Sequence, residues 1–183
     1  PVEHPAVLNT TRQLADLFDF KVTYLSVDDY GRVTPDAVRA AIREDTILVS
    51  VMGANNEIGS INPLAEIAKV CQEKGVPFHT DAVQYAAHFS LDVTETLVDL
   101  VSLGAHKFYG PKGVGALYIR HGTEIYPMQT GGSQEFGLRA ATQNISAIVG
   151  MAKAFQLVQV EGSQRREKLL PLRDSMIELV LSK

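Results

Sequence analysis

Short apolar runs alternate with amphipathic segments along this chain. Continuous apolar runs are typical of buried strands, and they occupy residues 46–52, 76–80, 99–103 and 114–119, with a further predicted strand at 21–27. Apolar residues recur at helical spacing in 7–18, 35–42, 64–74, 145–155 and 169–179. Because strands that alternate with helices form βαβ units, the pattern predicts an α/β fold: a mostly parallel sheet with helices on both faces.

Capping residues and breakers mark the ends of these elements. Thr34 and Pro35 form a helix start, and we expect Asn62–Pro63 to cap the next helix, which Gly75 ends. Residues 28–31 predict a turn. Pro171 lies inside the last helical pattern, where we expect it to kink the helix or to mark its start.

Three polar loops follow the predicted strands, at 55–59, 81–84 and 106–115. In an open α/β sheet, ligands bind beyond the carboxyl ends of the strands. These loops supply an amide pair, an acid with an amide, and a His-Lys pair. A carboxylate that faces a ring nitrogen, together with a lysine that forms a Schiff base, is a way to hold pyridoxal phosphate. The pattern therefore favours a pyridoxal-phosphate site.

Composition narrows the classes of partner. With 17 Lys and Arg against 21 Asp and Glu, the net charge of −4 argues against nucleic-acid binding and against anionic membranes. No apolar run approaches the roughly 20 residues that span a bilayer. The single cysteine, Cys71, excludes an internal disulfide and suits a reducing compartment such as the cytoplasm. The first residue is Pro1, so the sequence leaves open whether a targeting segment lies upstream.

Four segments, in this order, resemble the signatures of NifS/IscS-type cysteine desulfurases, a class-V aminotransferase family: 2–7, 54–59, 79–84 and 105–113. Gly131 to Glu135, with Arg139 and Thr142, extends the match. The resemblance implies the large domain of fold-type I pyridoxal-phosphate transferases, incomplete at both ends. We expect a partial cofactor-binding core at 1–144, and helices at 145–183 that lead toward an absent small domain.

The same resemblance implies a function. Such an enzyme converts L-cysteine to L-alanine and enzyme-bound sulfur, serves iron–sulfur cluster assembly, works as a homodimer and passes sulfur to an acceptor protein. Selenocysteine lyase, which releases selenium from selenocysteine, shares most of these motifs and is the alternative.

The resemblance assigns catalytic roles to two residues and cofactor-binding roles to others. Lys107 is expected to form the Schiff base with the cofactor and then to move the substrate Cα proton. His4 is expected to stack on the cofactor ring and to act as an acid or base. Asp81 is expected to keep the pyridine nitrogen protonated, and Gln84 to bond the ring hydroxyl.

Three further residues are expected to bind the cofactor. Asn56 is expected to contact the cofactor or the substrate carboxylate, and His106 to approach the phosphate. Thr142 is expected to reach the phosphate of the neighbouring subunit. No metal ligand set is assigned.

The sequence also departs from the family. Gly104 stands where many members have a phosphate-binding serine, and Ser133 and Ala141 stand where glycines are usual. The catalytic cysteine, the arginine that binds the substrate carboxylate and the threonine-containing phosphate loop have no counterpart. Cys71 lies on the apolar face of a helix, so we expect it to be a core residue.

The missing cysteine and phosphate loop leave open the hypothesis that the chain is a non-catalytic, truncated family member, which acts as a scaffold or dimer partner without turnover of its own. A further hypothesis is that His4, His79, Asp81 and His106 form the site of a metal hydrolase.

Overall fold

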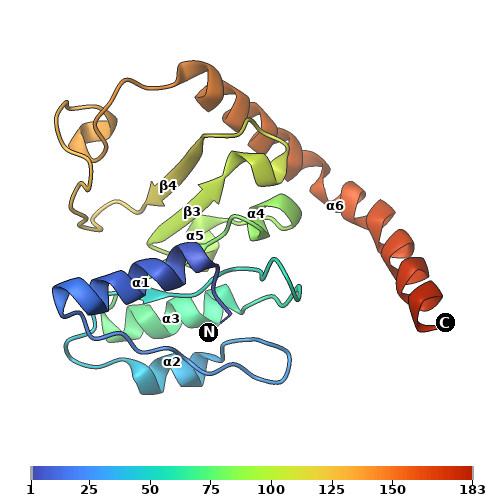
Figure 1. Cartoon of the computed structure of the whole chain (residues 1–183), viewed down its shortest axis with the longest axis horizontal. Coiled ribbons are helices and arrows are strands. Elements are labelled where there is room, and N and C mark those ends of the chain that lie inside the picture. Colours follow the sequence, from blue (N-terminus) through green and yellow to red (C-terminus); the bar gives the residue numbers. More distant parts are fainter. Residues whose placement is uncertain (1, 183) are drawn as a thin grey trace.

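A four-stranded sheet lies at the centre of the computed structural model, which describes residues 2–182. Pro1 and Lys183, which are the outer ends of the expected regions 1–144 and 145–183, lie outside the described residues. The strands follow the order β1-β2-β3-β4 (Figure 1): β1 (Val49–Ser50), β2 (Phe78–Asp81), β3 (Leu100–Gly104) and β4 (Gly115–Ile119). The first three strands are parallel and β4 is antiparallel to β3. The predicted mostly parallel α/β sheet is confirmed.

Helices occupy most of the segments with helical spacing: α1 (Pro5–Phe18), α2 (Pro35–Ala41), α3 (Leu64–Lys74), the short α4 (Tyr85–His88) and α5 (Val93–Thr96), and α6 (Ile145–Leu181), with 3₁₀ turns η1 (Ala105–Phe108) and η2 (Glu135–Gly137). The Thr34 side chain caps α2 by accepting a hydrogen bond from the amide of Ala37 at 3.2 Å. Gly75 ends α3 with φ 67°, a left-handed conformation that favours glycine. Both predicted boundaries are confirmed, whereas α4 and α5 were not predicted.

The main core lies between α3 and the sheet. Ile67 and Cys71 of α3 pack with Phe78 of β2 and Val101 of β3, and all four side chains are almost fully buried. Burial of each large apolar side chain contributes about 1.5–3 kcal/mol to folding. Cys71 is therefore a core residue, as predicted.

The edge of the sheet at β1 differs from the prediction. Residues 21–27 form no strand, and the predicted strand at 46–52 pairs with β2 only around Val49–Ser50. Ile47 and Leu48 are 66% and 44% exposed instead of buried. A strand is defined by hydrogen bonds to a neighbour, and within residues 2–182 no strand lies along the outer edge of β1.

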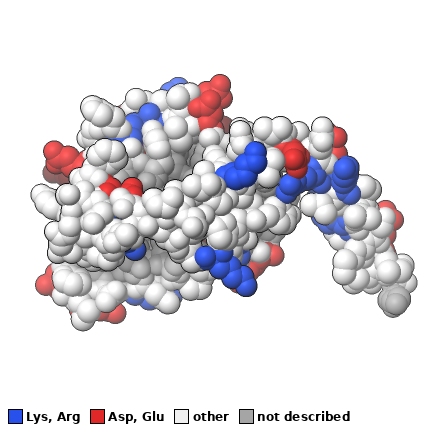
Figure 2. Space-filling model, turned by 90° about the horizontal axis from the view of Figure 1, so that it is seen from above, with Lys and Arg blue, Asp and Glu red and all other residues white. Residues whose placement is uncertain are grey.

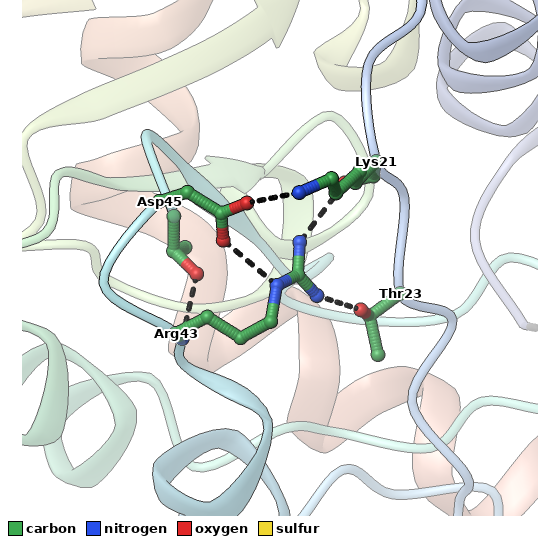
Figure 3. Close-up of polar contacts among 5 residues, drawn as sticks. Lys21, Thr23, Arg43 and Asp45 are labelled. Carbon is green, nitrogen blue, oxygen red and sulfur yellow. Dashed lines mark hydrogen bonds and ion pairs between the residues drawn. The ribbon is translucent and has the colours of Figure 1, made fainter.

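Polar contacts hold the extended segment 21–27 in place of sheet pairing (Figure 3). The Arg43 guanidinium donates to Asp45 Oδ1 at 2.9 Å, to Thr23 Oγ1 at 2.6 Å and to the Lys21 carbonyl, while Lys21 Nζ donates to Asp45 Oδ2 at 2.9 Å. The hydrogen bonds that the Asp45 carboxylate accepts from Lys21 and from Arg43 lower the pKa of Asp45 to about 2. Exposed ion pairs contribute little individually, so this network fixes geometry more than it adds stability.

Asn62 does not cap α3 as predicted. Pro63 occupies the capping position without a side-chain hydrogen bond. The buried Asn62 amide instead donates to the Met52 carbonyl and accepts from the Val33 amide, each at 2.8 Å. A buried amide has to satisfy both of its polar atoms, and here the partners that do so lie far away in the sequence.

The last two helical patterns form the single helix α6, which passes through Pro171 without interruption. The prediction that Pro171 marks a helix start is therefore wrong. A proline removes one backbone donor, and the helix nevertheless continues through this exposed stretch. Figure 1 shows the C-terminal half of α6 extending away from the sheet. The first half packs Met151, Val158 and Phe155 against Phe108 of η1.

Charge is mixed over the face that Figure 2 shows, with basic side chains gathered along the protruding α6. The basic residues of this stretch are Arg165, Arg166, Lys168 and Arg173. Arg165 pairs with Glu161 and Arg173 with Asp174, so acids on the same helix offset part of this charge. Within residues 2–182, none of the helices is both long enough and apolar enough to cross a membrane.

Candidate active site

The carboxyl ends of β1, β2 and β3 lie next to one another. The Gly53 amide, just after β1, donates to the Asp81 carbonyl at 2.8 Å, and the Ala82 amide donates to the Ser102 carbonyl of β3 at 3.1 Å. The loops that follow the three strands therefore begin at one edge of the sheet, as expected for parallel strands.

Asp81 lies at the centre of this edge and is half-buried. Its Oδ1 accepts a hydrogen bond from the Val83 amide at 2.9 Å, which orients the carboxylate. Among the described residues, no hydrogen bond is formed by Oδ2. One carboxylate oxygen is thus fixed by the turn and the other is available to a ligand.

His79 lies two residues before Asp81, on the same face of β2. Its Nδ1 is 2.8 Å from Ser50 Oγ, and its Nε2 is 2.9 Å from Ser102 Oγ. Burial lowers the pKa of His79, while the Asp81 charge opposes this effect. Both ring nitrogens are thus engaged by serine hydroxyls. Within residues 2–182, no group of three His, Cys, Asp or Glu side chains gathers that could hold a metal ion, so the structure gives the metal-hydrolase hypothesis no support.

Lys107 and His106 follow β3 on η1, and both side chains are exposed. The Gly110 amide closes this turn on the Ala105 carbonyl at 2.8 Å. A Cβ at position 110 would lie 2.9 Å from that carbonyl oxygen, so only glycine fits. Within the described residues, the Lys107 amine has no hydrogen bond or ion pair. Gln84 is half-buried at the start of α4, which contacts η1.

His4 reaches the same region from the N-terminal segment. It caps α1, and its Nδ1 accepts from the Ala6 amide at 3.1 Å. Asn55 holds the neighbouring loop: its Oδ1 accepts from the amides of Glu57 and Ile58, and its Nδ2 donates to the Val2 carbonyl at 2.7 Å. A cavity of about 300 Å³ separates the two segments, and its lining residues are Val2, Glu3, His4, Pro5, Asn55, Asn56, Glu57 and Ile58. The structure thus brings His4 and Asn56 together.

A second cavity, of about 490 Å³, lies between α1, residues 19–25, α2 and β1. None of the seven predicted site residues lines it. Asp81 and Lys107 line neither of these two cavities.

Thr142 lies on the exposed loop between η2 and α6. Within residues 2–182, no hydrogen bond links it to the carboxyl edge of the sheet. The neighbouring Ala141 has φ 107°, a conformation that L-residues rarely adopt. This is the position where the resemblance implies glycine.

Glu3 lies in segment 2–7, the first of the four segments that resemble the family, but the sequence predicts no role for it. Its Oε1 accepts a hydrogen bond from the Met52 amide at 2.6 Å, while Oε2 is buried without a hydrogen-bond partner. Burial, helped by the Asp81 charge, outweighs the hydrogen bond from the Met52 amide and raises the pKa of Glu3 to about 7. The sequence signal was its position directly before His4.

Comparison with known proteins gives consistent matches. The family model described as Aminotransferase class-V matches residues 1–179. The chain is 52% identical over 179 residues to the cysteine desulfurase IscS of Dictyoglomus turgidum, covering 98% of this chain and 45% of that protein. It is 51% identical over 180 residues to the IscS of Methanosarcina thermophila, covering 98% and 44%.

Solved structures agree with these relatives. A NifS-like protein superposes with a TM-score of 0.95 at 40% identity, covering 100% of this chain and 50% of that one. SspA in complex with cysteine superposes with a TM-score of 0.82 at 41% identity, covering 85% and 45%. The chain spans about half the length of the proteins it matches.

Proposed function

The chain belongs to the class-V aminotransferase family, and from this premise we propose that it forms the cofactor-binding part of a pyridoxal-phosphate-dependent cysteine desulfurase. The observation that carries the proposal is the placement of Asp81 at the end of β2 and of Lys107 just after the parallel neighbour β3. Asp81 supplies a carboxylate oxygen and Lys107 an amine, and neither atom has a hydrogen-bond partner within residues 2–182.

The side chains at this edge fit pyridoxal phosphate. An unpartnered lysine amine, an oriented carboxylate and a half-buried amide match the aldehyde, ring nitrogen and ring hydroxyl of that cofactor. When bound, pyridoxal phosphate takes up electron density from the substrate Cα. We assign Asp81 to hold the proton on the ring nitrogen, and Gln84 to donate to the ring hydroxyl.

Lys107 then has two tasks. Its amine would hold the cofactor covalently, and the same amine would take the proton from the substrate Cα. His4 covers the ring and exchanges a proton with the substrate. Asn56 contacts the cofactor or the substrate carboxylate.

The phosphate group needs donors from two places. His106 supplies one within the chain. We assign Thr142 to the phosphate of a second copy, which makes a homodimer the working form. This assignment agrees with the exposure of Thr142 and the absence of a link to its own carboxyl edge within residues 2–182.

The proposed substrate is L-cysteine, with L-alanine and enzyme-bound sulfur as products. The sulfur passes to an acceptor protein, and the proposed compartment is the cytoplasm. The thiol that receives sulfur is not Cys71, because that side chain is 1% exposed and burial raises its pKa to about 11. A buried neutral thiol is neither accessible nor nucleophilic.

The burial of Cys71 favours a second candidate for the 183-residue chain alone: it binds the cofactor without turnover, as a dimer partner or scaffold. An assay of alanine release tests this second candidate, because turnover requires a sulfur-accepting thiol and Cys71 does not supply one. Release of alanine from cysteine by this chain alone would contradict the second candidate.

A visible absorption spectrum after incubation with pyridoxal phosphate tests cofactor binding. We expect a visible band in the unmodified chain and in Lys112→Ala, a matched control that removes an exposed lysine from the same loop. Lys107→Ala is expected to lose the band. No band in the unmodified chain, or an equal band in Lys107→Ala, would contradict the proposal.

A further inference from the structure

The Glu3 side chain binds the end of β1 on the side where, within residues 2–182, no other strand pairs with it. The amides of Val51 and Gly53 donate to carbonyls of β2, so the Met52 amide between them points away from the sheet. The Glu3 carboxyl accepts its hydrogen bond at 2.6 Å. A side chain 49 residues away thus satisfies a backbone group that a neighbouring strand would otherwise pair.

The contact also fixes the segment that carries His4. Two bonds tie residues 2–3 to the end of β1 and its loop: Glu3 to Met52, and the Val2 carbonyl to Asn55. His4 follows directly and caps α1. The position of His4 over the 300 Å³ cavity therefore depends on these two anchors.

We propose that Glu3 is a positioning residue, whose neutral carboxyl anchors the His4 segment to the end of β1 beside Asp81. The inference rests on the proposed function for the roles of His4 and Asp81. The structure favours a neutral group, because Oε2 is buried without a hydrogen bond and Asp81 on β2 already supplies a negative charge. The other titratable groups on the cavity wall, His4 and Glu57, are exposed.

A carboxyl ¹³C NMR titration of the cofactor-free chain, labelled at glutamate, tests the charge state directly. The resonance lost in Glu3→Gln is expected to titrate near pH 7, in agreement with the raised pKa of Glu3. Asp81→Asn is expected to move its midpoint to lower pH, since it removes a like charge. An ordinary midpoint near 4.5, or one that Asp81→Asn leaves unchanged, would overturn the proposal.

Cofactor affinity tests the positioning role. Glu3→Gln keeps a neutral acceptor for the Met52 amide, so we expect pyridoxal phosphate to bind as it does to the unmodified chain. Glu3→Ala removes the anchor and is expected to weaken binding roughly tenfold, the loss typical of one hydrogen bond. Glu57→Ala, on the opposite wall of the cavity, is the matched control.

The outcomes separate the two proposals. Equal affinity in Glu3→Ala and the unmodified chain would refute the positioning role. Absence of binding in the unmodified chain would refute the proposed function, whereas the titration without cofactor would still decide the state of Glu3. If Glu3→Ala does not fold, a Glu3→Gln variant that binds tenfold more weakly than the unmodified chain would overturn the proposal.

Discussion

Replacing Glu3 by glutamine should change how the stability of the chain depends on pH. The folded state raises the pKa of Glu3 from its ordinary 4.5 to about 7, chiefly through burial. The folded chain therefore binds this proton more tightly than the unfolded chain does. Its contribution to stability is complete below pH 4.5 and is lost as the pH rises through 7.

The size of the effect follows from the shift. One pKa unit corresponds to about 1.4 kcal/mol, so a rise from 4.5 to about 7 is worth about 3 kcal/mol. Glu3→Gln cannot ionise, so its stability relative to the unmodified chain is expected to increase by about this amount between pH 4.5 and pH 8. For a chain of this length, about 3 kcal/mol corresponds to a difference of roughly 6–12 °C in Tm.

Thermal and urea unfolding at pH 5, 6, 7 and 8 would measure this difference. Glu57→Gln is the matched control, because it neutralises an exposed carboxylate on the neighbouring loop. A Glu3→Gln difference that is the same at pH 5 and pH 8 would show that the carboxyl is not a buried neutral group. The reasoning from burial and from the unpartnered Oε2 would then be refuted.

Two further predictions concern positions where the sequence departs from the resemblance, and a third concerns Cys71. Ala141→Gly should raise the free energy of unfolding by about 1 kcal/mol, because φ 107° is strained for alanine; a lower Tm would contradict this. Gly104→Ser should tighten pyridoxal-phosphate binding roughly 10- to 100-fold, because the serine adds a charge-assisted hydrogen bond to the phosphate. Val83 has to move slightly, since the new Cβ would lie 3.3 Å from its Cγ1. A titration showing unchanged affinity would argue against a phosphate site beside residue 104. Cys71 should react with a thiol reagent only when the chain unfolds, since the thiol is buried with a pKa of about 11; rapid labelling of the folded chain would show that it is accessible.

The open edge of the sheet explains why the predicted strands at 21–27 and 46–52 are missing or shortened. Their apolar patterns fit strands, but pairing requires a neighbour at hydrogen-bonding distance. The described chain provides β2 on one side of β1 and nothing comparable on the other. Instead, Lys21, Arg43 and Asp45 secure the extended segment from outside (Figure 3).

The sequence by itself determined most of the elements and the order of the chemistry along the chain. Helix starts at Thr34 and Pro35, the glycine end of α3 and the apolar runs of β2, β3 and β4 follow from local sterics and periodicity. Because parallel strands end at one edge, the same pattern also predicted that the loops with Asp81 and Lys107 meet there. The assigned roles of the site residues remain predictions.

Tertiary structure alone decided which polar groups are buried, and against what. Glu3 binds a backbone amide 49 residues away, and Asn62 binds one 29 residues away instead of capping its own helix. Helix α6 likewise continues through Pro171, although a proline removes one helical hydrogen bond. Propensities describe a residue and its near neighbours, whereas burial and unsatisfied hydrogen bonds depend on segments that meet only in the folded chain.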